Sequence, residues 1–228
     1  AGHNGMAGNA ILRAFKKKGY KHIICSNRSH LDLEEISQVD NFMRKEKPNV
    51  VILAAAKVGG IMANYKFPAD FILRNLKIQT NLIESSWKNN VKRFLFLGSS
   101  CIYPKLSEQP IKEEYLLRGD LEKTNEYYAL AKIAGIKLCQ ALNKQYGFDA
   151  ICLMPTNLYG TGDNYDPQTS HVLPALIKKF CDAKKNNHNE VICWGDGSPF
   201  REFLHCDDLG EASLFILENI SQKSILEK

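Results

Sequence analysis

Tyr128 and Lys132 form the residue pair in this sequence that is best suited to moving a proton. They lie four positions apart in a segment with helical spacing at 126–146, and residues at i and i+4 share one helix face, so the lysine ammonium should lie near the phenol. A neighbouring positive charge favours phenolate and is expected to lower the tyrosine pKa from about 10, so that the phenol could exchange protons near neutral pH. The same spacing also occurs in surface pairs, so its position in the chain has to support the catalytic interpretation.

A second group of reactive side chains, Ser99 and Cys101, lies directly after an apolar run at 94–97. Such a run is typical of a buried parallel strand, and ligands of open α/β sheets bind at the carboxyl ends of the strands. If the chain stays extended here, the two-residue periodicity places Ser99 and Cys101 on the same side. A single cysteine in this position is more often a small buried apolar residue than a catalyst, so the loop alone leaves the role of Cys101 open.

Glycines at positions 2, 5 and 8 precede a stretch that can form a helix, at 10–18. This spacing lets the backbone approach a pyrophosphate at a helix N-terminus, which predicts a dinucleotide site, although a simple turn and helix cap fits the glycines equally well. Arg28 follows the next strand-like run, where an acidic residue would bind the ribose of NAD and an arginine would accept the 2′-phosphate of NADP. Arg28 therefore favours NADP(H). A solvated arginine is the alternative, and Asp32 and Glu34 lie close by in the sequence.

Apolar and amphipathic segments alternate along the chain and would position these residues. Strand-like runs occur at 22–25, 50–55, 94–97 and 150–154, and helical spacing occurs at 34–46, 69–88 and 126–146. This alternation predicts an α/β fold of Rossmann type, that is, a doubly wound parallel sheet. We expect residues 1–155 to form an NADP-binding Rossmann-type domain. Residues 156–228 are richer in Pro, Gly, Asn and Asp and should form a smaller mixed region that contributes substrate-binding segments.

The composition excludes several classes of protein. The net charge of +5 is too small to indicate a nucleic-acid or membrane surface, and no apolar run approaches the roughly 18 residues of a membrane span. Seven cysteines without C-x-x-C spacing indicate free thiols of a cytoplasmic protein, and we expect no metal. A Gly-rich loop normally follows a strand, and the tail at 221–228 ends without a closing element. We therefore expect an internal piece of a longer protein, without the first strand and the C-terminus.

Six longer stretches agree with one known family, namely residues 54–61, 96–105, 128–135, 154–160, 170–175 and 194–203. They resemble the extended short-chain dehydrogenase/reductases that act on nucleotide sugars. The Ser-Ser-Cys loop at 99–101 and the Ser-His-Val at 170–172 narrow the resemblance to enzymes that make GDP-L-fucose from GDP-4-keto-6-deoxy-D-mannose. Those enzymes epimerise C3 and C5 and then reduce the 4-keto group with NADPH. The resemblance covers nearly the whole chain and implies a homodimer, paired through the helices at 69–88 and 126–146.

The resemblance also implies roles for individual residues. Ser99 and Tyr128 would hold the C4 carbonyl oxygen, with Tyr128 giving its proton, and Lys132 would bind the nicotinamide ribose. Cys101 and His171 would be the acid and base that move protons at C3 and C5. The residues implied to bind the cofactor are Gly2, Asn4, Gly5, Met6, Gly8, Arg28, Leu97, Gly98, Ser99, Ser100, Lys132, Pro155, Thr156, Asn157, Leu158 and His171, and those implied to bind the GDP-sugar are Lys179, Trp194 and Arg201.

The sequence departs from the family pattern at two places. Asn4 stands where family members often have an arginine that helps to bind the 2′-phosphate, which weakens the preference for NADP and leaves Arg28 to support it. Thr161-Gly162 replaces a frequent Pro-His.

Two other functions are alternatives to this assignment. One is another nucleotide-sugar enzyme of the same family, a 4-epimerase, reductase or dehydratase; a plain epimerase needs neither Cys101 nor His171. The other is a non-catalytic dinucleotide sensor on the same fold. Sensors of this kind commonly lose the tyrosine or the lysine, and both are present here as Tyr128 and Lys132, so the sequence favours the enzyme.

Overall fold

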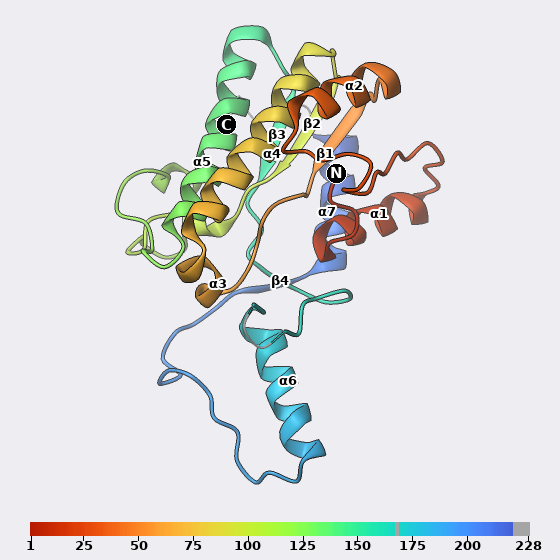
Figure 1. Ribbon diagram of the computed structural model, residues 1–228. Helices are drawn as coiled ribbons and strands as arrows, with labels where there is room; N and C mark the ends of the chain where they lie inside the picture. Colours follow the sequence, from red (N-terminus) through yellow and green to blue (C-terminus); the bar gives the residue numbers. More distant parts are fainter. Residues whose placement is uncertain (167–168, 221–228) are drawn as a thin grey trace.

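Three parallel strands form the central sheet of the computed structural model, which describes residues 1–166 and 169–220 (Figure 1). The strands are β1 (Val50–Leu53), β2 (Arg93–Leu97) and β3 (Ala150–Leu153), hydrogen-bonded in the order β1-β2-β3. In their register, Val51 lies opposite Phe94, and Phe96 lies opposite Cys152. The strands are almost wholly apolar because both faces of a parallel sheet are covered.

Five helices cover the two faces of this sheet: α1 (Met6–Lys18), α2 (Ile36–Glu46), α4 (Pro68–Lys88), α5 (Glu126–Tyr146) and α7 (Cys206–Asn219). Successive side chains of a strand point to opposite faces. Phe94 and Phe96 therefore pack with residues of α2, α4 and α5, whereas Ile52 and Leu97 pack with residues of α1 and α7. The sheet is doubly wound, which confirms the predicted fold class.

Helices α1 and α7 lie side by side although they come from opposite ends of the described chain (Figure 1). Gly210 permits the close approach, because a Cβ atom there would lie 2.6 Å from the carbonyl oxygen of Ala10. Ile11 and Leu209 pack in the same apolar cluster. The region after residue 155 thus contributes one helix to the cover of the central sheet. The division of the chain into domains at that residue stays a prediction.

A smaller part of the structure follows the third strand. Strands β4 (Asn157–Tyr159) and β5 (Phe203–His205) pair in parallel, and α6 (Val172–Lys185) projects away from the central sheet, below it in Figure 1. The short helix α3 (Ile61–Lys66) follows the loop after β1. Within the described part of the chain, no helix is long and apolar enough to cross a membrane. The tail at 221–228 lies outside the described residues.

The helices expected at 34–46, 69–88 and 126–146 and the strands expected at 50–55, 94–97 and 150–154 are confirmed. The strand expected at 22–25 is wrong, because these residues have no regular structure. A β-rich run becomes a strand only when a neighbour completes its hydrogen bonds, and no described segment pairs with this one. Ala1 runs beside β1 instead: its amino group donates to the Ile52 carbonyl oxygen at 2.7 Å, and the Ala54 amide donates to the Ala1 carbonyl oxygen at 3.0 Å.

Candidate active site

The loop that follows β2 turns sharply at the carboxyl end of the sheet. The Gly98 amide still donates to the Leu153 carbonyl oxygen, at 2.7 Å, and the chain then enters a short 3-10 helix, Ser100–Ile102. Ser99 caps this turn, because its hydroxyl accepts a hydrogen bond of 3.3 Å from the Cys101 amide. The condition that the chain stays extended through Cys101 is therefore not met. The cap nevertheless keeps the side chain of Ser99 close to Cys101.

Tyr128, in the first turn of α5, completes a cluster with this loop. The Tyr128 hydroxyl is hydrogen-bonded with Ser99, and Cys101 lies near enough for a charge on its thiol to raise the pKa of the phenol. Phe71 of α4 meets the Tyr128 ring edge-on, with the ring centroids 6.3 Å apart. Two elements thus bring a phenol, a hydroxyl and a thiol together at the carboxyl end of the sheet, where a carbonyl substrate could contact all three.

Burial governs the charge states of Tyr128 and Lys132. The pKa of Tyr128 is raised from its ordinary value, first by burial and then by the nearby Cys101, while the hydrogen bond with Ser99 acts in the opposite direction. The expectation of a lowered pKa is wrong, because burial raises it; the Lys132 Nζ donates instead to the Leu97 carbonyl oxygen, at 2.7 Å. Burial also lowers the pKa of Lys132 itself to about 8. The phenol therefore keeps its proton near neutral pH and is suited to donate it.

Lys132→Met is expected to make the cofactor-free protein more stable at pH 7, by up to about 3 kcal/mol. The unfolded lysine holds its proton up to about pH 10.5 but the folded one only up to about pH 8, so folding at neutral pH carries the cost of a buried charge. Wild-type stability should rise with pH between these two values, and the variant should lack that rise. Urea unfolding of both proteins at pH 7 and pH 9.5 measures the difference; equal slopes with pH would contradict it.

Close backbone contacts shape the Gly-rich loop. A Cβ atom on Gly8 would lie 2.1 Å from the Gly2 carbonyl oxygen, and one on Gly2, whose φ is 88°, would lie 2.5 Å from the Ala55 amide nitrogen. Gly5 precedes α1 without any side-chain cap, and no acidic residue lies in the first turn. The amides of that turn and the positive end of the helix dipole are therefore free for an anion. The residues fit the pyrophosphate of a dinucleotide.

Asn27 and Arg28 lie beside this loop, at the place expected for the adenosine ribose. Asn4 Nδ2 donates to Asn27 Oδ1 at 3.0 Å, so Asn4 ties the two segments together instead of supplying a positive charge. Arg28 Nη2 lies 3.2 Å from Asp32 Oδ2 and 2.8 Å from Glu34 Oε1. The Arg28 side chain is still 62% exposed, so the guanidinium can reach a ligand.

The other residues implied to bind the cofactor lie near the strand ends or at the start of α1. The Ser100 amide donates to the Pro155 carbonyl oxygen at 3.2 Å, which holds the segment after β3 against the loop after β2. Thr156 Oγ1 and Asn157 Nδ2 both donate to the carbonyl oxygen of Glu202, at 3.0 Å. The rest lie in α1, β2 and β4, namely Met6, Leu97 and Leu158. Their contact with a cofactor stays a prediction.

Lys179 and Trp194 form a second group, on the smaller part of the structure. Lys179 Nζ lies 4.7 Å from the centroid of the Trp194 ring and donates to the Ile192 carbonyl oxygen at 2.8 Å. The exposed, flat indole offers a stacking surface of the kind that nucleobases use. Arg201 lies on the same long segment, exposed, with Nη1 donating to the Phe200 carbonyl oxygen at 2.7 Å.

His171 lies immediately before α6, exposed and without a capping hydrogen bond. The residues before it rest on the loop after β1, because the Gly60 amide donates to the Thr169 carbonyl oxygen at 3.0 Å. Across the described residues, no hydrogen bond or ring contact joins His171 or Arg201 to the Tyr128 cluster. The contacts thus bring together Ser99, Cys101, Tyr128 and Lys132, and they leave the role of His171 a prediction.

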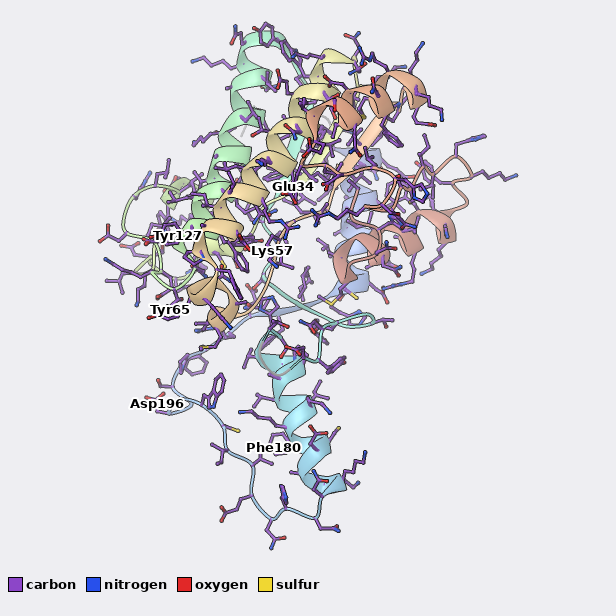
Figure 2. The ribbon with its side chains drawn as sticks, in the orientation of Figure 1. Glu34, Lys57, Tyr65, Tyr127, Phe180 and Asp196 are labelled. Atoms are coloured by element: carbon purple, nitrogen blue, oxygen red, sulfur yellow. The ribbon has the colours of Figure 1, made fainter. Side chains whose placement is uncertain are left out.

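Asn75, a buried side chain of α4 beside the site, is not among the residues predicted from the sequence. Its Oδ1 accepts a hydrogen bond of 2.8 Å from the Lys57 amide, and its Nδ2 donates to the Lys57 carbonyl oxygen at 2.9 Å. Lys57, labelled beside α4 in Figure 2, lies with Nζ 5.9 Å from the centroid of Phe71, the ring that meets Tyr128. The feature of the sequence that could have identified Asn75 is an asparagine among the apolar positions of the helix expected at 69–88.

His205, Cys206 and Asp207 place potential metal-binding atoms within 4.8 Å of one another. The guanidinium of Arg13 already pairs with Asp207, and its Nη2 lies 3.6 Å from Cys206 Sγ. A cationic side chain at this position opposes a metal cation. The group is better explained as part of the contact between α1 and α7.

The fold and the arrangement of this site are those of a dinucleotide-dependent enzyme family. The chain belongs to the NAD dependent epimerase/dehydratase family, whose sequence model matches residues 1–226. It is 57% identical over 221 residues to the putative GDP-L-fucose synthase 2 of Arabidopsis thaliana, a match that covers 97% of this chain and 67% of the relative. It is 51% identical over 218 residues to the GDP-L-fucose synthase of Escherichia coli (strain K12), covering 96% of this chain and 68% of the relative.

Among solved structures, this chain is similar to MlghC, a GDP-mannoheptose C4 reductase from Campylobacter jejuni with NADP bound. The TM-score is 0.89 at 39% sequence identity, and the match covers 98% of this chain and 75% of that one.

Proposed function

We propose that this protein converts GDP-4-keto-6-deoxy-D-mannose to GDP-L-fucose, by epimerisation at C3 and C5 followed by NADPH-dependent reduction at C4. The observation that carries the proposal is the convergence of Ser99, Cys101 and Tyr128 at the carboxyl end of β2. The relatives named GDP-L-fucose synthase at more than 50% identity support the same assignment, and the NADP-bound neighbour supports the cofactor.

Reduction of a ketone needs a proton donor at its oxygen and a hydride donor at its carbon; NADPH, when bound, supplies the hydride. Tyr128 gives the proton, because its raised pKa keeps the phenol protonated at neutral pH. Ser99, hydrogen-bonded with Tyr128, holds the same carbonyl oxygen. Lys132 is largely protonated below its pKa of about 8 and would bind the nicotinamide ribose of the cofactor.

Epimerisation inverts a carbon next to the ketone, so a proton must leave one face of that carbon and return to the other. Because one group can reach only one face of the carbon, two groups on different elements suit this task better than one. Cys101 lies beside Tyr128 on the loop after β2, and His171 lies at the start of α6. The ketone makes the neighbouring protons acidic, and thiols and imidazoles both exchange protons near neutral pH. Cys101 and His171 would therefore act as the acid and base at C3 and C5.

The GDP group would be held by the smaller part of the structure. Trp194, with Lys179 over its ring, provides a surface for the guanine. Arg201 is exposed on the same segment, and its planar guanidinium can bind a diphosphate through two parallel hydrogen bonds. Figure 2 shows this part, with Phe180 on α6 and Asp196 on the segment that leads to β5.

The experiment that tests the proposal is NADPH consumption with GDP-4-keto-6-deoxy-D-mannose, followed by NMR of the sugar product. We expect consumption of NADPH with GDP-L-fucose as the product. A GDP-6-deoxyhexose that keeps the D-manno configuration at C3 and C5 would establish a C4 reductase, a second candidate that the similarity to a GDP-mannoheptose C4 reductase favours. No consumption of NADPH would refute the reductase step and support an epimerase or a sensor.

The protein is further proposed to be a homodimer that pairs through α4 and α5. These helices pack against each other, and each leaves a large apolar side chain exposed, Leu73 on α4 and Leu130 on α5. Tyr65 and Tyr127 lie exposed near the same ends of the helices (Figure 2). Light scattering should give the mass of two chains, and the Leu73→Glu/Leu130→Glu variant should give the mass of one. A monomeric wild-type protein would refute the proposal.

Cytoplasmic location is likewise proposed, on the ground that all seven cysteines are free thiols. Alkylation under denaturing conditions, without reductant, should then modify seven thiols per chain.

A further inference from the structure

One carboxylate oxygen near the expected adenosine site holds two arginines. Glu34 Oε1 lies 2.8 Å from Arg28 Nη2 and 2.9 Å from Arg74 Nε. Asp32 Oδ2 adds a second contact to Arg28, at 3.2 Å. The four side chains carry two positive and two negative charges, so the group as a whole is neutral. Because Arg74 pairs with the same carboxylate oxygen, it neutralises part of the negative charge of Glu34 that would otherwise act on Arg28 alone.

The burial of these side chains increases from Arg28 inward. Arg28 is 62% exposed, Arg74 is 27% exposed and Glu34 is 15% exposed. Arg74 belongs to α4, whose Asn81 also donates from Nδ2 to the Leu33 carbonyl oxygen at 2.9 Å. Figure 2 shows Glu34 next to α4. A packed helix therefore fixes the loop that carries Arg28, while Arg28 itself faces the solvent.

The same loop is joined to the Gly-rich loop by the hydrogen bond between Asn4 and Asn27. In dinucleotide-binding folds, an unpaired carboxylate at this place accepts the ribose hydroxyls of NAD and repels the 2′-phosphate of NADP. Glu34 follows Arg28 by only six residues and would be such a carboxylate if no arginine were paired with it. Whether Glu34 repels the 2′-phosphate of the cofactor therefore depends on whether another residue of the protein neutralises its charge.

We propose that Arg74 is a positioning residue that sets the preference of this site for NADPH over NADH. Arg74 binds Glu34 from the helix side, which leaves the exposed guanidinium of Arg28 able to bind the 2′-phosphate. Without Arg74, the full charge of Glu34 is directed at Arg28 and adds to the repulsion of the phosphate. The inference rests on the dinucleotide cofactor of the proposed function, and it assigns the preference to a residue that does not touch the nucleotide.

The test is the dissociation constant of NADPH and of NADH, measured by calorimetry on the wild-type protein and on Arg74→Met at physiological salt. We expect Arg74→Met to weaken NADPH binding by about tenfold and to change NADH binding by less than about twofold. The Arg74→Met/Glu34→Gln double variant should return NADPH binding to within about threefold of the wild type, because the charge that Arg74 balanced is gone. Arg44→Met, which removes an exposed arginine whose Nη2 donates to Asn41 Oδ1 at 2.7 Å, is the matched control.

Equal weakening of both nucleotides by Arg74→Met would overturn the proposal, because it would show a structural role. A double variant that binds NADPH as weakly as Arg74→Met would also overturn it, since Arg74 would then not act through Glu34. A wild-type protein that binds both nucleotides equally would overturn the preference while the proposed reaction could stand. Binding of neither nucleotide would refute the proposed function and this inference together. Thermal unfolding of each variant identifies any that has failed to fold, and Arg74→Lys then replaces Arg74→Met, with the same shift expected at smaller size.

Discussion

Tyr128→Phe is expected to lower kcat for substrate-dependent NADPH oxidation by roughly a thousandfold. The change removes the hydroxyl that is hydrogen-bonded with Ser99 and leaves the edge-on contact with Phe71 in place. Because burial and the nearby Cys101 raise the pKa of Tyr128, the wild-type phenol stays protonated throughout the neutral range. The loss of rate should therefore be the same at pH 6.5 and at pH 8.5, as measured by the absorbance of NADPH.

Three measurements separate the loss of the proton donor from damage to the fold. Tyr127→Phe, at the exposed neighbouring position, should keep nearly full activity. Tyr128→Phe should still bind NADPH within about twofold of the wild type, because no phosphate contact is lost. It should also still exchange the protons at C3 and C5 with deuterated water, since these are assigned to Cys101 and His171. If Tyr128→Phe kept more than a tenth of the wild-type rate, another group would have to supply the proton.

The elements that position this site could be predicted because their patterns are local. The apolar run at 94–97 and the helical spacing at 126–146 each specify one element, and the structure has both. The run at 22–25 is equally β-rich, but a strand also needs a partner, which its own residues do not supply. The turn at 99–101 could not be predicted for a similar reason, since the serine caps it through a hydrogen bond from the backbone.

The sequence predicts which residues form the site better than it predicts their charge states. The spacing of Tyr128 and Lys132 placed both on one face of α5, but it did not say that Lys132 Nζ would bind the Leu97 carbonyl oxygen. Burial, which depends on α4 and the sheet together, then reversed the expected direction of the Tyr128 pKa shift. The pairing of Arg74 with Glu34 joins residues far apart in the chain, and no spacing rule connects them.

Cys101→Ser is expected to abolish epimerisation while leaving reduction, so that the product keeps the D-manno configuration at C3 and C5. Serine has nearly the same size, and the turn is capped through the Cys101 amide, so the loop should keep its shape. An alcohol does not ionise near neutral pH, whereas an ordinary thiol has a pKa of about 8.5. Proton exchange at C3 and C5 with deuterated water, followed by NMR, should fall by at least about a hundredfold.

The position of Cys101 lets this experiment separate epimerisation from reduction. Cys101 lies beside Tyr128, so a negative charge on the thiol favours the protonated phenol, and the same site can remove a proton at C3 or C5 while Tyr128 keeps its own. His171→Gln should lose exchange as well, because inversion needs groups on both faces of the carbon. Cys25→Ser, at an exposed thiol, is the matched control and should leave exchange unchanged. If Cys101→Ser still formed GDP-L-fucose, the thiol would have no part in epimerisation, and its closeness to Tyr128 would serve only the packing of the loop against α5.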